Sequence, residues 1–177
     1  MSIATRSGDE GTTGLMFNRR VSKADPRVEA YGSVDELNAS LGVVRASAVL
    51  PETAECLLGI QKNLVALMGE LAVAPEDMAR YRSSAYPKVE PLMLEQVDRA
   101  VELIEARSVK FEGWATPGAT LPAAHLDVAR TVCRRAERAV VRLGEQGGME
   151  VSPLIVRYLN RLADLLWLMA RLEESRH

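Results

Sequence analysis

The chain has 177 residues, of which 47% are hydrophobic and only 5% aromatic, which suits one helical domain spanning 1–177 and is poor for a β-sandwich or barrel. Its formal charge of −2 and pI near 5.8 argue against a nucleic-acid surface, which requires a clustered excess of lysine and arginine. The N-terminus lacks a hydrophobic signal core, and no run of about 18 apolar residues spans a bilayer, so we expect a cytoplasmic protein without a membrane partner.

Residues 1–25 form a polar opening segment. Three glycines at a spacing of three are interleaved with hydroxyl side chains, and a basic group follows them: Gly8, Gly11, Gly14, Arg19, Arg20 and Lys23. Backbone N–H groups beside glycine can approach phosphate oxygens, and the cations balance the phosphate charge. The segment has no Gly-Lys-Ser/Thr ending, which excludes a Walker loop. Two interpretations stay open, a polyphosphate-binding loop and a frayed polar terminus.

Five segments after this opening carry a helical period of apolar residues: 26–48, 52–74, 90–108, 121–146 and 151–175. Prolines mark their starts, where the missing N–H is tolerated. Residues 74–88 show no clean period, so we expect a long connection there with one short turn of helix. An up-and-down helical bundle is the simplest all-α architecture that buries five apolar faces.

The first helix carries a polar stripe beside its apolar face: Tyr31, Asp35, Asn38, Gly42 and Arg45. Asp35 therefore lies at a packing edge. A carboxylate in such a place is stabilised by a cation, and Arg130 is the leading candidate for a charge-assisted pair. A solvated Asp35 without a partner is the alternative.

The segment 130–138, RTVCRRAER, places five ionic side chains in nine residues of an otherwise apolar helix. The face of this helix that we expect to be buried consists of Leu126, Ala129, Cys133, Ala136, Val140 and Leu143. Arg130, Arg134 and Glu137 form a half-buried row along its shoulder, and the other arginines point to solvent. Half-buried charges need partners, so the row predicts either internal carboxylates or an anionic ligand.

Chemistry that relies on a protein nucleophile or metal is poorly represented. His125 and His177 are isolated, and no serine or cysteine has a local base. Cys56 and Cys133 lie in apolar helical patterns, which indicates buried thiols rather than a disulfide or a metal site. In the last helix, Asn160 lies in a polar row where it can recognise a ligand's donors and acceptors, although a plain surface asparagine is commoner.

Four blocks in this order resemble the PduO-type ATP:cob(I)alamin (corrinoid) adenosyltransferases: residues 5–15 (TRSGDEGTTGL), 20–38 (RVSKADPRVEAYGSVDELN), 129–138 (ARTVCRRAER) and 158–164 (YLNRLAD). The resemblance implies a ferritin-like five-helix bundle assembled as a homotrimer, with ATP and the corrinoid bound in clefts between subunits. It also implies the reaction, in which Co(I) attacks the 5′-carbon of ATP to give adenosylcobalamin and triphosphate. Because Co(I) is itself a strong nucleophile, this chemistry needs no protein base.

The resemblance assigns roles to single residues. Those implied to bind ATP are Thr5, Arg6, Gly8, Asp9, Gly11, Thr12, Thr13, Lys23, Arg134, Glu137 and Asn160. Mg²⁺ is expected to arrive with ATP, and no protein ligand to it is assigned. Arg130 is implied to pair with Asp35 across the subunit boundary and so to fix the catalytic cleft.

A bulky hydrophobic residue before a Pro-Gly turn closes the lower face of the corrin in this family, and it is usually phenylalanine. Here Trp114 precedes Pro117 and Gly118, while another alignment places Phe111 at that position. The reaction further implies a flavin-dependent reductase that supplies Co(I) and an adenosylcobalamin-dependent enzyme that receives the product. Three alternatives are a non-catalytic ATP-binding sensor, a phosphotransferase and a ferritin-like oxidase, and identification of the products separates them.

Overall fold

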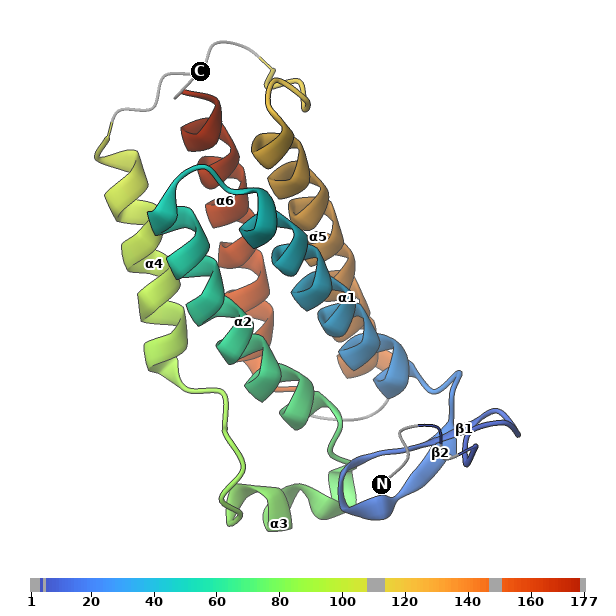
Figure 1. The fold of residues 1–177 in the computed structure, drawn as a ribbon. Helices are drawn as coiled ribbons and strands as arrows, with labels where there is room; N and C mark the ends of the chain where they lie inside the picture. Colours follow the sequence, from blue (N-terminus) through green and yellow to red (C-terminus); the bar gives the residue numbers. More distant parts are fainter. Residues whose placement is uncertain (1–3, 5, 108–113, 147–150, 176–177) are drawn as a thin grey trace.

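A computed structural model describes residues 4, 6–107, 114–146 and 151–175. Five long helices run alternately up and down the molecule (Figure 1): α1 (Pro26–Ser47), α2 (Pro51–Leu71), α4 (Pro91–Glu105), α5 (Leu121–Gln146) and α6 (Pro153–Glu174). In space α1 packs against α2 and α5, α5 packs against α6, and α6 packs against α4. The predicted all-α up-and-down bundle is confirmed.

The helix boundaries follow from local chemistry. Proline occupies the first turn of each long helix, where the N–H has no intrahelical acceptor. Asp25 caps α1, because its carboxylate accepts a hydrogen bond of 2.8 Å from the backbone N–H of Arg27. The predicted ranges agree with the observed ones to within three residues at each end, and the largest differences are the ends of α2, at Leu71 rather than residue 74, and of α4, at Glu105 rather than residue 108.

The core lies along the seams between the helices. All six residues expected on the buried face of α5, from Leu126 to Leu143, are buried. They face buried leucines of α1 and α6, among them Leu37, Leu41, Leu159 and Leu162. Burying one such leucine contributes about 1.5–3 kcal/mol, so these seams hold α5 and α6 in a fixed relation.

A small cap covers the lower end of the bundle in Figure 1. It consists of residues 12–22 and 75–89, and we refer to it as the end cap: β1 (Thr12–Gly14), the 3-10 helix η1 (Met16–Asn18), β2 (Arg20–Ser22), η2 (Pro75–Asp77), α3 (Met78–Arg82) and the connection that follows. β1 and β2 pair antiparallel with Thr13 opposite Val21. The strands were not predicted from sequence, whereas the short helical turn between 74 and 88 is confirmed.

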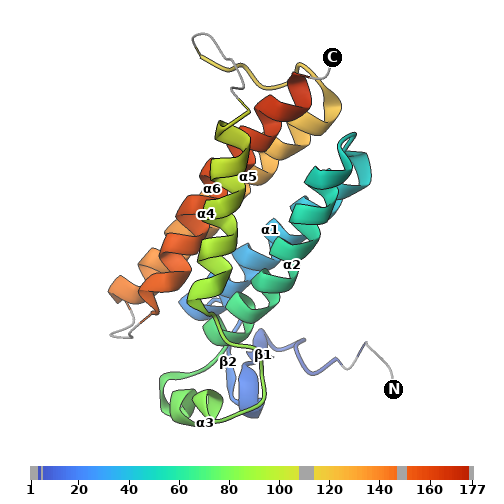
Figure 2. The same cartoon turned by 90° about the vertical axis from the view of Figure 1, so that its left-hand side faces the viewer.

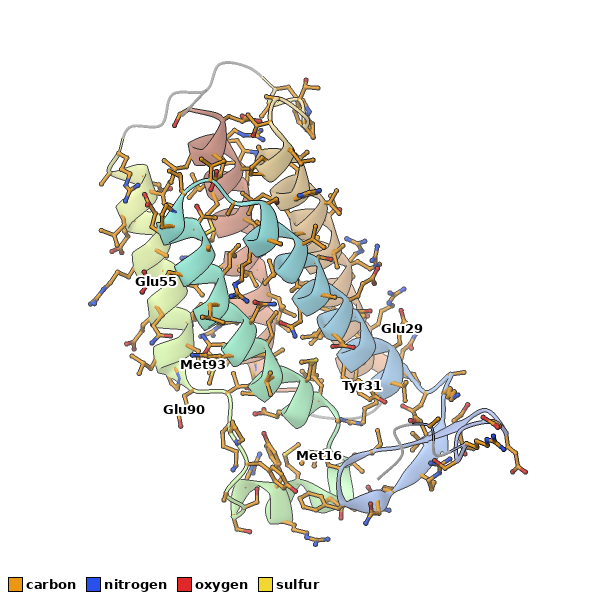
Figure 3. The ribbon with its side chains drawn as sticks, in the orientation of Figure 1. Met16, Glu29, Tyr31, Glu55, Glu90 and Met93 are labelled. Carbon is orange, nitrogen blue, oxygen red and sulfur yellow. The ribbon has the colours of Figure 1, made fainter. Side chains whose placement is uncertain are left out.

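The end cap is joined to the bundle by few contacts. The backbone N–H of Met16, labelled in Figure 3, donates to the carbonyl of Ala72 just after α2 at 3.0 Å. Nε of Arg19 lies 2.8 Å from Oδ2 of Asp77, and this ion pair links the β-hairpin to η2. The hydrogen bond from Arg19 lowers the pKa of Asp77 below its usual value.

No single helix in the described ranges is long and apolar enough to cross a membrane. Only α2 taken together with residues 75–82 meets that criterion of length and composition, and the two parts are bent by 106°. Most of the apolar side chains of α2 are buried, among them Leu57, Leu64 and Leu67, and the helix lies beside α1 in Figure 2.

Candidate functional site

The glycine-rich segment forms compact turns. The N–H of Asp9 donates to the carbonyl of Arg6 at 3.3 Å, and the N–H of Gly11 donates to the carbonyl of Gly8 at 3.2 Å. Gly11 has φ +76°, a left-handed conformation that favours glycine. The N–H of Lys23 then donates to the carbonyl of Gly11 at 2.9 Å, which brings the start of α1 back to the loop.

The absence of a side chain at Gly8 has a direct consequence for Lys23. A Cβ at position 8 would lie 3.1 Å from Nζ of Lys23 and 3.3 Å from the carbonyl oxygen of Thr12. The ammonium group therefore lies directly over the loop because residue 8 is glycine. This places a cation next to exposed backbone, an arrangement suited to an anion.

The other two basic residues of the segment have different neighbours. The guanidinium of Arg20 donates to the carbonyl of Ser7 at 2.5 Å and to Oγ1 of Thr12, so it closes the loop. Arg19 is paired with Asp77 and belongs to the end cap. Arg20 is thus a loop residue that was not among the predicted ATP ligands, although its position beside Lys23 had marked it as part of the basic group.

The row of Arg130, Arg134 and Glu137 on α5 was predicted to be half-buried, and two of its three side chains are. The side chain of Arg130 is 27% exposed and Glu137 is half-buried, but Arg134 is exposed. Nδ2 of Asn160 on α6 donates to Oε1 of Glu137 on α5 at 3.3 Å. The structure therefore brings together two residues predicted from separate segments to bind one nucleotide, with Arg134 one turn away on the same helix.

The helix face under this row is chemically inert. Cys133 is buried, its Sγ donates to the carbonyl of Leu159 at 3.2 Å, and burial raises the pKa of its thiol well above the ordinary value. Burial likewise raises the pKa of the half-buried Cys56. Burial therefore disfavours the nucleophilic thiolate form of both cysteines.

Asp35 is exposed on α1, and among the described residues it has no ion pair. Arg130 instead has Asp127, one turn earlier on α5, as its partner at 3.2 Å from Nε. The prediction that Asp35 is buried against Arg130 is therefore wrong within one chain, because α1 turns Asp35 to the outside of the α1–α5 seam. The pair between Asp35 and Arg130 of different subunits stays a prediction.

Trp114 lies at the other end of the bundle. It precedes α5, whose start is at the opposite end from the β-hairpin in Figure 1, and its side chain is 92% exposed. From Leu121 to Arg134 the helix rises by about 20 Å, so Arg134 lies between Trp114 and the glycine-rich loop along the axis. The alternative residue Phe111, and also Thr5 of the opening segment, lie outside the described residues.

Within one chain these groups do not form a single closed site. In the described ranges no hydrogen bond or ion pair joins Gly8, Gly11 or Lys23 to Arg134, Glu137 or Asn160. The chain thus presents two separate polar surfaces, the loop and the α5–α6 row, each suited to an anion.

Several polar groups near the start of α5 are paired in a way that the sequence did not indicate. Arg171 lies three turns after Asn160 on α6, its side chain is 3% exposed, and its Nη2 lies 2.7 Å from Oδ2 of Asp127. Nε of Arg171 also lies 2.9 Å from Oε2 of Glu174. Nδ1 of the part-buried His125 lies 2.8 Å from Oγ of Ser47.

In the part of the chain that the structure describes, no group of three or more His, Cys, Asp or Glu side chains is arranged so as to hold a metal ion. Thr12, one of the hydroxyls of the loop, accepts a hydrogen bond from Arg20.

The molecule is thus a helical bundle with two polar surfaces suited to an anion, a glycine-rich loop under a lysine and an arginine-bearing row on a second helix. The chain belongs to the cobalamin adenosyltransferase family, because the model of that family matches residues 3–173.

Known relatives agree with this assignment. The chain is 39% identical over 177 residues to the corrinoid adenosyltransferase PduO of Citrobacter freundii, covering 98% of this chain and 50% of that protein. It therefore spans about half the length of the PduO proteins it matches. It is 40% identical over 170 residues to the cobalamin adenosyltransferase of Cupriavidus metallidurans, covering 96% of this chain and 86% of the other.

Solved structures are similar over nearly the whole chain. A variant PduO-type ATP:corrinoid adenosyltransferase from Lactobacillus reuteri, complexed with cobalamin and ATP, superimposes with a TM-score of 0.86 at 30% identity. The match covers 98% of this chain and 91% of that one. A second variant of the same enzyme, complexed with ATP, gives a TM-score of 0.84 at 28% identity.

Proposed function

We propose that this protein transfers the 5′-deoxyadenosyl group of ATP to the cobalt of cob(I)alamin. The electron pair of Co(I) forms a bond to C5′, and the bond between C5′ and the triphosphate oxygen breaks. Triphosphate leaves with the electron pair of the broken C5′–O bond. The products are adenosylcobalamin and triphosphate. The observation that carries the proposal is the contact between Glu137 and Asn160 beside Arg134, on a chain of this family.

The triphosphate is proposed to bind at the glycine-rich loop. Gly11 holds the loop in a left-handed turn, and Lys23 over Gly8 supplies a cation for the developing charge of the leaving group. Arg6, Asp9, Thr12 and Thr13 belong to the same turns, and Thr5 precedes them. Mg²⁺ enters as part of the ATP complex.

The adenosine part is proposed to bind at the α5–α6 row. Asn160 already donates to Glu137, so its carbonyl oxygen and the second carboxylate oxygen of Glu137 are the groups available to a ligand. Arg134 lies beside them and is exposed. Since the loop and this row do not meet in one chain, we propose that they meet between subunits.

We propose a homotrimer for the same reason. The outer faces of α1 and α5 carry exposed apolar side chains, including Val43 at 52% and Val128 at 57% exposed. A subunit placed there covers these valines and brings its Asp35 or Arg130 to the other member of the pair. The pair then fixes the geometry of the cleft.

The corrinoid is proposed to bind next to Trp114. An indole that is 92% exposed presents a large apolar surface to water, and a corrin ring can cover such a surface. Closing the lower face of the ring displaces the axial ligand and makes Co(II) easier to reduce, and Phe111 is the second candidate for this role. A flavin-dependent reductase and an adenosylcobalamin-dependent enzyme are the implied partners, in the cytoplasm.

An anaerobic assay with chemically reduced cobalamin, ATP and Mg²⁺ tests the proposal. We expect loss of the Co(I) spectrum together with formation of adenosylcobalamin and triphosphate. Release of ADP contradicts the proposal in favour of a phosphotransferase. ATP that binds but stays intact with verified Co(I) contradicts it in favour of a nucleotide sensor.

A further inference from the structure

Four charged side chains of alternating sign form a chain near the start of α5, with its two middle members buried. Nε of Arg171 lies 2.9 Å from Oε2 of Glu174, and Nη2 of the same arginine lies 2.7 Å from Oδ2 of Asp127. The other oxygen of Asp127, Oδ1, accepts from Nε of Arg130 at 3.2 Å. One carboxylate therefore contacts two arginines from two helices.

From Arg171 through Asp127 to Arg130, the side chains become less buried. The side chains of Arg171 and Asp127 are 3% and 5% exposed, whereas that of Arg130 is 27% exposed. The guanidinium of Arg171 also lies over the ring of Trp167, with 5.7 Å from Cζ to the ring centroid. The inner members are thus fixed by packing and charge, and Arg130 is the outer member that can reach a ligand or a neighbouring subunit.

The printed contact of Asp127 with Arg130 is on the side of the guanidinium, at Nε. Among the described residues Arg130 forms no ion pair with any other carboxylate. Its Nη1 and Nη2 form the end-on fork that binds a carboxylate bidentately. Asp127 therefore holds the group through Nε, in an orientation in which this fork can bind a second partner.

We propose that Asp127, itself held by the buried Arg171, is a positioning residue that orients the guanidinium of Arg130. The inference rests on the proposed function, in which the end of Arg130 fixes the cleft by pairing with a second subunit. Neither Asp127 nor Arg171 touches the substrates in this scheme. Both act through Arg130.

A purely structural role is a poor explanation of the inner pair. Nη1 of Arg171 is buried and has no hydrogen-bond acceptor among the described residues. A buried ion pair with an unsatisfied donor stabilises a fold weakly, and apolar side chains of similar size often replace such a pair without loss of stability. The double variant D127L/R171M is therefore expected to fold.

The test is a double-mutant cycle between D127L/R171M and Arg130→Ala, with kcat and the KM for ATP measured under Co(I) conditions. We expect D127L/R171M to keep its melting temperature and the KM for ATP but to lose kcat. Arg130→Ala should then cost at least about tenfold less in kcat/KM in this background than in the parent, because the group it removes is already misplaced. Equal cost in both backgrounds overturns the proposal.

A second readout does not depend on activity. The Nε–H signal of Arg130 in an NMR spectrum should be protected from solvent exchange in the parent and lose that protection in D127L/R171M. Unchanged protection overturns the proposal even if the parent fails to adenosylate cobalamin, so the two hypotheses fail separately. If the double variant does not fold, the same cycle and the same signal are measured in Asp127→Asn, which keeps the volume.

The matched control is Asp98→Asn, which removes a different aspartate–arginine pair between two helices. Asp98 on α4 pairs with Arg161 on α6, and the pair is much more exposed than the one formed by Asp127. We expect wild-type kcat from this variant and no change in the cost of Arg130→Ala. If Asp98→Asn changes the cost of Arg130→Ala as much as D127L/R171M does, then loss of any aspartate–arginine pair has this effect. That result overturns the assignment to Asp127.

Discussion

The α5–α6 row and the end cap both carry residues proposed to bind or support ATP, but the two regions are built differently. Glu137 and Asn160 project from helices that bury a continuous apolar seam, with Cys133 and Leu159 fully enclosed beneath them. The hairpin of the end cap has strands of three residues each and one partly buried pair at its centre. The polar contacts of the end cap with the segments that end α2 include single hydrogen bonds, from Met16 N–H to the carbonyl of Ala72 and from Val89 N–H to Glu70.

The difference suggests that the α5–α6 row and the glycine-rich loop contribute to function in different ways. The row is preorganised, because the packing that folds the bundle also fixes its side chains. The glycine-rich loop is specified by backbone conformation at a few positions, so its geometry is easier to perturb and easier to complete by a ligand. Variants of the row should therefore affect chemistry without stability, and variants of the loop should affect ATP affinity.

The largest effect is expected from Arg134→Ala in the row. Removing a cation aimed at the nucleotide should lower kcat/KM by about 10²–10³-fold, the usual size for loss of one charge-stabilising group. The melting temperature should stay unchanged because the side chain is exposed. Steady-state kinetics with Co(I) and thermal unfolding measure both.

Arg138→Ala is the matched control for Arg134→Ala. Arg138 is an exposed arginine one turn further along the same helix, and it is not assigned to the site. Equal losses in both variants indicate that only the net charge of α5 matters, which contradicts the role given to Arg134.

Trp114→Ala sharpens the comparison by testing a third region, at the opposite end of the bundle. Because the indole is 92% exposed, stability and ATP affinity should change little. Adenosylation that starts from Co(II) should slow by at least about tenfold, since the lower face of the corrin is no longer closed. Leu92→Ala, which removes a side chain 57% exposed on α4, serves as the control. Full turnover from Co(II) in Trp114→Ala excludes this role and directs attention to Phe111.

Gly11→Ala is the test of the loop. A side chain at φ +76° costs about 1 kcal/mol, although nothing lies within 4 Å of the added Cβ. If the loop binds the triphosphate, this strain should raise the KM for ATP by about fivefold and leave kcat nearly unchanged. Gly14→Ala is the control, because it also meets no atom within 4 Å and needs no positive φ. Equal effects of the two variants rule out backbone geometry as the reason for glycine at position 11.

The bundle could be predicted from sequence because its signals are local and repeated. The stripe from Leu126 to Leu143 recurs at helical spacing over five turns, and prolines mark the helix starts. The β-hairpin could not, because Thr12–Gly14 and Arg20–Ser22 are too short to establish a period of two. Their pairing depends on backbone contacts across η1 that leave no pattern in the side chains.

The candidate site was predictable as residue types but not as partners. Glu137 and Asn160 were assigned to one site through family resemblance, and the structure brings them into contact. Asp127, the partner of Arg130, lies at i, i+3 spacing on the same helix, but the sequence analysis considered only Asp35 for that role. The second partner of Asp127 could not be predicted, because Arg171 reaches it through the antiparallel packing of α5 on α6, a relation without sequence periodicity.

The smallest effect, and the one that tests how tightly the end cap closes on the bundle, is expected from Glu70→Gln. Glu70 lies near the end of α2 and lines a cavity of about 360 Å³ with Tyr81 and Lys88. Burial raises the pKa of Glu70 above its usual value, although the N–H of Val89 donates to its Oε2 at 3.4 Å and opposes the shift. The ionised form is therefore disfavoured in the folded protein.

The sign of the pH dependence follows. Below about pH 4.5 Glu70 is protonated in both the folded and unfolded states and carries no penalty. As the pH rises from there through the raised folded pKa, the unfolded chain ionises first and stability is lost. Glu70→Gln should thus be more stable than the parent at pH 7 and equal to it near pH 4. Glu55→Gln, an exposed glutamate of the same helix labelled in Figure 3, should show neither difference. A Glu70→Gln variant that is less stable at pH 7 means that the attraction of Lys88 and Arg82 exceeds the cost of burial, and that the end cap is held to α2 by charge.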